Sequence, residues 1–445
     1  MPSVPNYQLR PRPAPVASAP ALDEQQRAVV DHPGGPLLVL AGPGTGKTTT
    51  LVESVVDRIE RRGLSPSEVL MLTFSRKAAG ELRTRIGARL GRTTSGVLAS
   101  TFHAFCYALV RRFADAELYA DPPALLSAPE HDVRLRELLV GERDTGRVDW
   151  PASLRPALRT RGLAGELRGL LARARSLGYD PPDLVEAGLS AGRPEWVAAG
   201  GFFAESLDVF DQQHQLDYAE LVHRATIVAS DPANQAALRR EHAFVVVDEY
   251  QDTDPAQVAL LQALAGDGRD LLVVGDPDQS IYAFRGADPR GLLRFPDRFH
   301  TRAGDRAPLK VLTTTRRFGP GLLAASRSVV AALPVPGSLD RDTFTQFREP
   351  ASAEPACGDG AVQVRTFTSP AAEAEHIALL LRRAHLDDDL PWSQMAVLVR
   401  SGVQSIPRLQ RALSAAGVPV DVAGDEVPLR AQPAVQTLLL ALRMA

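Results

Sequence analysis

The chain has 445 residues and a formal net charge of -3, and of its 50 basic residues the lysines are Lys47, Lys77 and Lys310 alone. A chain of this length exceeds what one hydrophobic core usually serves, so we expect roughly two or three domains. Because the net charge is slightly negative, bulk electrostatic attraction to nucleic acid is excluded, and any such contact must use local basic patches. The two cysteines give neither a disulfide framework nor a metal-ligand spacing, which favours a reducing, cytoplasmic environment.

The start of the chain predicts a tail and a short helix. Residues 1–21 are rich in proline and alanine and predict a disordered or extended tail. Residues 22–30 predict a helix, on which Gln26 could offer its amide donor and acceptor to the edge of an adenine ring. A surface glutamine without a ligand is the alternative. No run of about 18 apolar residues occurs anywhere, so we expect no membrane partner.

A glycine-rich loop lies between an apolar run, 37–40, and a helix-like stretch, 49–62. Its three glycines allow successive N–H groups to turn inward around an oxyanion, and the following helix adds the positive end of its dipole. Lys47 could reach the β- and γ-phosphates, and the Thr48 hydroxyl could hold Mg²⁺. ATP and Mg²⁺ are therefore the expected cofactors, and a turn without a ligand is the alternative. The residues predicted to hold the nucleotide are Gln26, Ala41, Gly42, Pro43, Gly44, Thr45, Gly46, Lys47, Thr48 and Thr49.

Two further apolar runs each end in Thr-Phe beside a polar or basic group. Alternating strand-like and helix-like stretches predict a parallel sheet, in which ligands gather at the carboxyl ends of the strands. An aromatic ring with nearby donors could stack a base and hold a phosphate of single-stranded DNA. The alternative is that each phenylalanine caps the core. The candidate DNA-binding residues at these two edges are Thr73, Phe74, Lys77, Thr101, Phe102 and His103.

Residues 113–216 contain helix-like segments interrupted by proline and glycine. The stretch between Lys47 and Asp248 is far longer than a compact nucleotide-binding domain needs, so we interpret 113–216 as an inserted helical domain. Its many arginines indicate either ordinary solvated helix faces or a basic side that contacts duplex DNA.

The nucleotide-binding sheet resumes with the apolar run 244–247, followed by Asp248 and Glu249. Opposite a phosphate loop, Asp248 would hold Mg²⁺ and Glu249 would activate the attacking water. A further run, 271–275, leads into a loop in which Gln279 could sense the γ-phosphate while its neighbours contact bases. The candidate base contacts in this loop are Tyr282, Phe284 and Arg285, and core aromatic residues are the alternative.

Six motifs in chain order resemble those of UvrD/Rep-type superfamily 1 DNA helicases: Gln26, AGPGTGKT, LTFSRKAA, STFHAF, VVVDEYQD and VGDPDQSIYAFRGA. Residues 312–317 resemble the motif that begins the family's second motor domain, and Arg317 aligns with its arginine finger. The sequence Ser-Arg-Lys at 75–77 departs from the commoner Thr-Asn-Lys, and Phe284 replaces the usual tryptophan. With the proline-rich tail and the arginine-rich composition, these variants are most similar to the actinobacterial AdnA/AdnB helicase-nuclease subunits.

The resemblance implies an α/β fold: a P-loop NTPase (RecA-like) motor domain with a parallel sheet, an inserted α-helical domain and part of a second RecA-like domain. The implied activity is ATP-dependent 3′ to 5′ translocation on single-stranded DNA, with unwinding at duplex junctions, in DNA repair or recombination. A second helicase-nuclease subunit is a candidate partner. The alternatives are a non-unwinding, ATP-binding subunit that grips DNA and a small-molecule kinase, which would not explain aromatic residues at the strand edges. The implied catalytic residues are Lys47, Asp248, Glu249, Gln279 and Arg317.

The expected boundaries are 1–21 for the tail, 22–112 and 217–300 for the first motor domain, 113–216 for the insertion and 301–445 for part of the second motor domain. The apolar run 395–399 predicts a strand of that second domain. Because the chain ends before any counterpart of the family's later motifs, we expect the N-terminal part of a longer protein or the product of a truncated gene.

Overall fold

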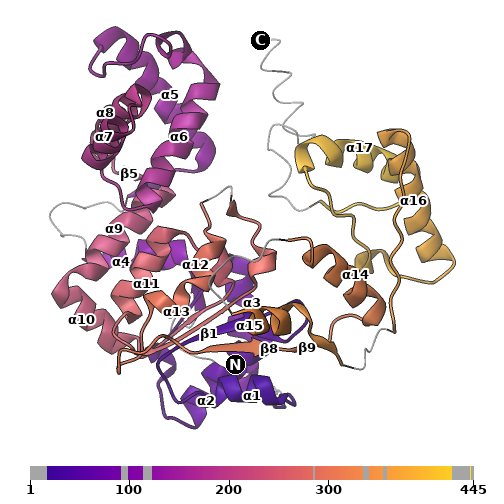
Figure 1. Ribbon diagram of the computed structural model, residues 1–445. Coiled ribbons are helices and arrows are strands. Elements are labelled where there is room, and N and C mark those ends of the chain that lie inside the picture. Colours follow the sequence, from indigo (N-terminus) through magenta and orange to yellow (C-terminus); the bar gives the residue numbers. More distant parts are fainter. Residues whose placement is uncertain are drawn as a thin grey trace, which may run out of the picture. The chain divides into compact units, whose positions relative to one another are not determined.

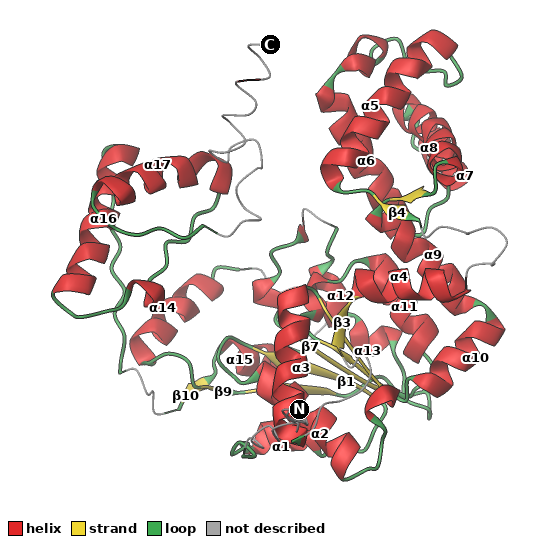
Figure 2. Cartoon of the chain, turned by 180° about the vertical axis from the view of Figure 1, so that it is seen from behind, coloured by secondary structure: helices red, strands yellow, loops and turns green. Residues whose placement is uncertain are grey.

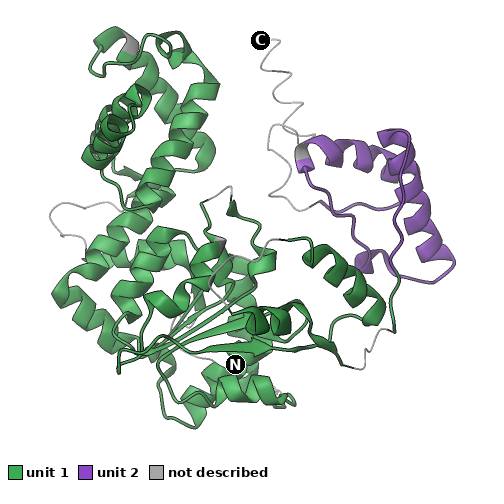
Figure 3. Ribbon diagram, viewed as in Figure 1, with its two compact units in different colours: residues 1–361 green, residues 362–445 purple. Residues whose placement is uncertain are grey.

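The computed structural model describes residues 18–91, 99–113, 123–283, 286–333, 340–353, 358–422 and 441. The chain divides into two compact units, residues 1–361 and residues 362–445, drawn in green and purple in Figure 3. The finer division expected from the sequence, into a tail, two motor domains and an insertion, stays a prediction.

A six-stranded sheet with the order β3-β2-β6-β7-β1-β8 forms the centre of the first unit (Figure 1). Every neighbouring pair of strands runs parallel. The predicted α/β fold class with a parallel sheet is therefore confirmed. The strands are β1 Pro36–Ala41, β2 Val69–Thr73, β3 Ala99–Thr101, β6 Phe244–Val247, β7 Asp270–Gly275 and β8 Leu309–Leu312.

Both faces of this sheet are buried under helices. Because side chains alternate along a strand, Leu38 and Leu40 of β1 belong to one core while Leu37 and Val39 belong to the other. Strands buried on both faces have continuous apolar sequences, which is why these runs were recognisable. One face packs against α1 Glu24–Val30, α2 Lys47–Glu60 and α3 Arg76–Leu90, and the other against α4 Phe102–Phe113, α9 Tyr218–Ser230 and α11 Pro255–Ala265.

The segment between α4 and α9 has a hydrophobic core of its own, which includes Leu135, Trp150, Leu167 and Phe202. A short parallel pair, β4 Ala124–Leu125 with β5 Gln215–Leu216, joins its two ends (Figure 2). A separate core with paired ends is what an inserted domain requires. Its helices are α5 Ala128–Thr145, α6 Arg161–Ser176, α7 Pro181–Ser190 and α8 Pro194–Gln212.

Strand β8 forms one edge of this sheet. This strand lies beyond residue 300, where we expected the second motor domain to begin, and it pairs with β1 from Leu38 to Ala41. The remaining elements are α10 Pro232–Glu241, α12 Pro289–Leu293, α13 Phe295–Arg298, β9 Thr314–Thr315, α14 Pro320–Val330, α15 Arg341–Arg348 and β10 Ala351–Ser352, and β9 pairs in parallel with β10.

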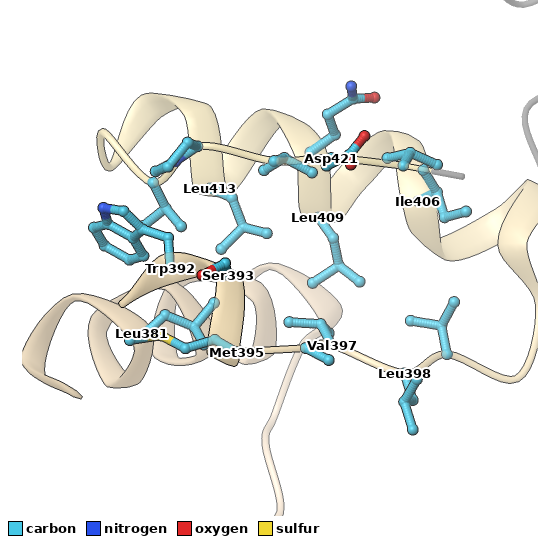
Figure 4. A pocket seen from close by; sticks show the side chains of 17 residues that line it. Leu381, Trp392, Ser393, Met395, Val397, Leu398, Ile406, Leu409, Leu413 and Asp421 are labelled. Carbon is cyan, nitrogen blue, oxygen red and sulfur yellow. The ribbon is translucent and has the colours of Figure 1, made fainter. Parts of the chain in front are cut away.

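The second unit contains α16 Pro370–Leu386 and α17 Gly402–Ala415, which pack around a small apolar core. The predicted strand at 395–399 is not formed, because its backbone makes none of the hydrogen bonds with another described segment that a strand needs. With Trp392 and Leu409, these residues line an apolar cavity of about 720 Å³ instead (Figure 4). Across the described parts of both units, no helix is long and apolar enough to cross a membrane.

Candidate nucleotide site

The predicted phosphate loop follows β1 directly and ends where α2 begins at Lys47. Gly44 and Gly46 have φ angles of +77° and +89°, in the left-handed region where side chains are strained. A Cβ atom on Gly44 would also lie 2.4 Å from the Cβ of Arg317, so glycine is required there for two reasons. The buried Thr45 hydroxyl donates to the Gly42 carbonyl at 2.8 Å. The loop is thus held in a turn that presents the N-terminus of α2 to an anion.

The carboxyl ends of the strands bring Lys47 and Glu249 together. Lys47 Nζ lies 3.4 Å from Glu249 Oε2, and the Lys47 side chain is 13% exposed. Asp248 comes directly after β6, and its N–H donates to the Leu72 carbonyl of β2 at 3.0 Å. Two motifs that are far apart in sequence therefore meet at the phosphate loop.

The carboxylates beside Lys47 suit a magnesium ion. Burial, followed by the Glu249 charge, raises the pKa of Asp248 to about 6. The same two causes raise the pKa of Asp252 to about 6, and its Oδ1 is buried with no hydrogen-bond partner among the described residues. No cluster of metal-ligating side chains in the described part of the chain could hold an ion alone. Mg²⁺ at nucleotide sites usually takes one or two carboxylates, waters and substrate phosphates, so this donor set together with Thr48 fits it.

A series of hydrogen bonds runs from Glu249 to Gln279. Gln251 Nε2 donates to Glu249 Oε2 at 2.8 Å, and Gln251 Oε1 accepts from the Asp276 N–H at 2.9 Å. The Gln279 side chain in turn donates to the Asp276 carboxylate. Burial raises the pKa of Asp276 to about 6, and the Lys47 charge opposes this rise. The sequence prediction omits Gln251 and Asp276, although both lie within the motifs that contain Glu249 and Gln279.

The segment after β8 lies against the phosphate loop. The Thr315 hydroxyl donates to the Pro43 carbonyl at 2.9 Å, and the Arg316 N–H donates to the Gly44 carbonyl at 2.9 Å. Arg316 Nη2 also donates to Asp23 Oδ2 at 2.7 Å. Arg317 is exposed, and its side chain has no hydrogen-bond or ion-pair partner among the described residues. The two adjacent arginines thus differ: Arg316 anchors the segment, and Arg317 keeps its guanidinium available beside the loop.

Gln26 supports the phosphate loop from α1. Its side chain is buried, Nε2 donates to the Thr45 carbonyl at 2.9 Å, and Oε1 accepts from the Asp23 N–H at 3.1 Å. Both ends of the amide are therefore bound to the protein itself. The adenine contact predicted for Gln26 stays a prediction, and the structure adds a loop-positioning role that the sequence did not indicate.

The first predicted DNA-binding edge meets the loop that follows Gln279. The rings of Phe74 and Tyr282 stack with their centroids 4.4 Å apart and an interplanar angle of 28°. Thr73 is buried at the end of β2, and Lys77 is exposed in the first turn of α3. Phe284 and Arg285 lie outside the described residues.

The residues of the second predicted DNA-binding edge differ in how deeply their side chains are buried. Phe102 is 3% exposed and belongs to the core under α4, so its ring cannot offer a face to a base, and its predicted DNA contact is not supported. Thr101 Oγ1 accepts from the Ala104 N–H at 3.2 Å and caps the start of α4. His103 is only partly buried and meets Tyr218 edge to face, with ring centroids 5.0 Å apart.

Comparison with known proteins gives one consistent family. Residues 22–300 match the UvrD/REP helicase N-terminal domain. The chain is 32% identical to the ATP-dependent DNA helicase UvrD2 of Mycobacterium tuberculosis over 97% of its length, which is 59% of that protein. It is 30% identical to UvrD1 of the same organism over 91% of the chain and 50% of UvrD1. DNA helicase II of Escherichia coli is 32% identical over 63% of the chain and 36% of the relative.

The parallel sheet and the phosphate loop define a nucleotide-binding protein of the P-loop class. The chain belongs to the UvrD/REP helicase family, whose N-terminal domain accounts for residues 22–300. It spans about 59% of the length of UvrD2.

Proposed function

We propose that this protein is an ATP-dependent DNA helicase that moves 3′ to 5′ along single-stranded DNA and unwinds duplex junctions during repair or recombination in the cytoplasm. The observation that supports this best is the connected series from Lys47 and Glu249 through Gln251 and Asp276 to Gln279. Three residues further along, Tyr282 stacks on Phe74, so the nucleotide site and a base-stacking surface share one loop.

Each side chain around the nucleotide has a distinct task in this proposal. Lys47 neutralises charge on the β- and γ-phosphates, and Glu249 accepts the proton of the attacking water. Gln279 contacts the γ-phosphate, and Arg317 stabilises the charge that develops as the terminal bond breaks. Mg²⁺, held by Thr48 and Asp248, would supply electrostatic stabilisation of the phosphate oxygens.

The DNA side uses the rings at the carboxyl edge of the sheet. Every base has a π-face, so an aromatic stack such as Phe74 with Tyr282 can bind single-stranded DNA without reading its sequence. The exposed Lys77 would pair with a backbone phosphate. When Gln279 changes its contacts after hydrolysis, Tyr282 moves because it belongs to the same loop. The affinity of the Phe74–Tyr282 surface for a base then changes.

We expect Tyr282→Ala and Gln279→Ala to separate DNA binding from its effect on hydrolysis. Because base stacking contributes about 1–3 kcal/mol per base, Tyr282→Ala should raise the single-stranded DNA concentration that half-saturates the ATPase by about tenfold. Gln279→Ala should leave this concentration nearly unchanged and reduce the stimulated rate. The measurement is the ATPase rate against the concentration of single-stranded DNA.

Tyr179, which is 39% exposed in the connection between α6 and α7, provides the matched control, and Tyr179→Ala should behave as the parent. Identical curves for the parent and Tyr282→Ala would show that the Phe74–Tyr282 stack is internal packing, and the base-stacking role would be withdrawn.

The elevated pKa values predict an unusual pH profile. Asp248 and Asp276, with pKa values of about 6, are ionised above that pH and become protonated as the pH falls through it. The ATPase rate should therefore have its acid midpoint near pH 6, approach its full value about one to two pH units above that and be lost below it; this midpoint is about two pH units higher than ordinary aspartates would give. Added Mg²⁺ should move the midpoint to lower pH, because a cation favours the ionised Asp248. If the ATPase rate were half-maximal near pH 4, and this pH did not change with the Mg²⁺ concentration, these assignments would be contradicted.

A finer assignment, to a subunit like those of the AdnA/AdnB helicase-nucleases, would add a second subunit as the partner. It rests on the Ser-Arg-Lys variant at 75–77, Phe284, the proline-rich tail and the arginine-rich composition. The competing proposal is a non-unwinding, ATP-binding subunit that grips DNA. DNA-stimulated hydrolysis without strand separation would favour that alternative.

A further inference from the structure

An ion pair connects the Gln279 turn with a helix about 70 residues later in the chain. Arg348, the last residue of α15, donates from Nε to Asp278 Oδ2 at 2.9 Å and from Nη2 to Asp278 Oδ1 at 2.7 Å. The two side chains are 12% and 13% exposed. Two parallel, charge-assisted bonds fix the direction of a carboxylate as well as its distance.

The helix that carries Arg348 is itself firmly held. Asp340 caps its start and accepts from the Thr343 N–H at 2.8 Å, and Phe347 is buried in the core that covers one face of the sheet. The Arg348 guanidinium lies 4.4 Å from the centre of the Phe344 ring, and Nη1 donates to the Leu333 carbonyl at 3.2 Å. The guanidinium therefore approaches Asp278 in a fixed orientation.

The turn on the other side of the ion pair is short. Residues Pro277–Gln279 form a single 3₁₀ turn after β7, and the Asp276 carboxylate accepts both the Asp278 N–H, at 3.0 Å, and the Gln279 side chain. Asp276 thus stabilises the turn through contacts with the turn's own residues, and Arg348 of α15 stabilises it through Asp278. A cavity of about 210 Å³ lies beside it, lined among others by Pro43 of the phosphate loop, Gln279 and Arg348.

We propose that Arg348 is a positioning residue for ATP hydrolysis: through Asp278 it fixes the turn so that the Gln279 side chain faces the γ-phosphate position beside the phosphate loop. This inference rests on the proposed ATPase function. It gives Arg348 no contact with the nucleotide. An ordinary stabilising ion pair would leave the chemistry unchanged once the protein is folded, whereas a positioning pair changes the chemistry in a folded protein.

The test measures kcat, KM and nucleotide affinity for Arg348→Ala in the purified protein. We expect kcat to fall about ten- to hundredfold, because a small displacement of a catalytic side chain has an effect of this size. Affinity for a fluorescent ADP should stay unchanged, and affinity for a slowly hydrolysed fluorescent ATP analogue should fall, because ADP lacks the γ-phosphate. Arg341→Ala, at the exposed start of the same helix, is the control and should match the parent.

Asp278→Asn provides a second variant that keeps the shape of the turn and removes the charge. It should lower kcat as Arg348→Ala does, and the double variant should be no slower than either single variant, because both remove the same interaction. Parent-like kcat in a folded Asp278→Asn or Arg348→Ala protein would overturn the positioning role and leave the proposed ATPase intact. Absence of hydrolysis in the parent protein would instead overturn the proposed function.

Discussion

Lys47→Ala should abolish ATP hydrolysis and leave the fold intact. The ammonium group pairs with Glu249 and belongs to neither core of the sheet, and Glu249 is 36% exposed and can be solvated when it is left alone. Loss of a group that stabilises charge in the transition state should lower kcat at least about hundredfold. The measurements are the steady-state ATPase rate and the thermal unfolding temperature.

Lys310→Ala removes the same charge from β8 and should keep the parental ATPase rate. If Lys47→Ala retained full activity, the assignment of residues 41–48 as the catalytic phosphate loop would have to be abandoned. A large drop in unfolding temperature would indicate instead that the lysine holds the structure together.

Glu249→Gln should keep nucleotide binding and stop turnover. A glutamine preserves the shape of the side chain and can still accept the bond from Gln251, but it cannot take a proton from water. General-base catalysis contributes about 10²- to 10⁴-fold, so the ATPase rate should fall within that range. Fluorescent nucleotide binding and single-turnover hydrolysis measure the two effects separately.

The matched control is Glu137→Gln, an exposed glutamate of α5 that pairs with Arg134. It should leave both binding and turnover unchanged. Loss of nucleotide binding together with hydrolysis in Glu249→Gln would assign Glu249 a structural role, because a residue acting only as the base is not needed for the ground-state complex.

The sheet and the phosphate loop could be predicted because their signals are local. Strands buried on both faces leave apolar runs, and the loop needs glycine at positions 44 and 46 to reach positive φ angles. The predicted strand at 395–399 failed for a non-local reason: a strand forms only where another segment hydrogen-bonds to it, and no described residue does so.

The relations between motifs could not be predicted in the same way. Phe74 and Phe102 both follow a strand and a threonine, yet Phe74 stacks on Tyr282 while Phe102, the first residue of α4, is buried in the core. Whether each ring is buried depends on which distant elements pack around it, and the local sequence does not encode that packing. The pairing of Asp278 with Arg348 likewise depends on how α15 docks on the core, through Phe347.

Among the polar residues of the site, too, the roles of single motifs could be predicted, whereas the contacts between motifs could not. Lys47 and Glu249 were predicted to belong to one nucleotide site because each lies in a motif with a known chemical task, and in the structure Lys47 Nζ lies 3.4 Å from Glu249 Oε2. Gln251 joins Glu249 to Asp276 through two hydrogen bonds, of 2.8 Å and 2.9 Å. Such bonds can be recognised only in a three-dimensional structure. Arg316 and Arg317 are adjacent in sequence, and the structure distinguishes them because Asp23 binds Arg316.

Strand separation is the most direct measurement of the central claim. The substrates are two partial duplexes of equal length, one with a 3′ single-stranded tail and one with a 5′ tail, incubated with the purified protein, Mg²⁺ and ATP. We expect unwinding of the 3′-tailed duplex, little unwinding of the 5′-tailed duplex, and none of either with Lys47→Ala or without ATP. ATP-dependent unwinding of the 5′-tailed duplex alone would contradict the proposed polarity, and binding of both substrates without ATP-dependent unwinding of either would contradict the helicase assignment.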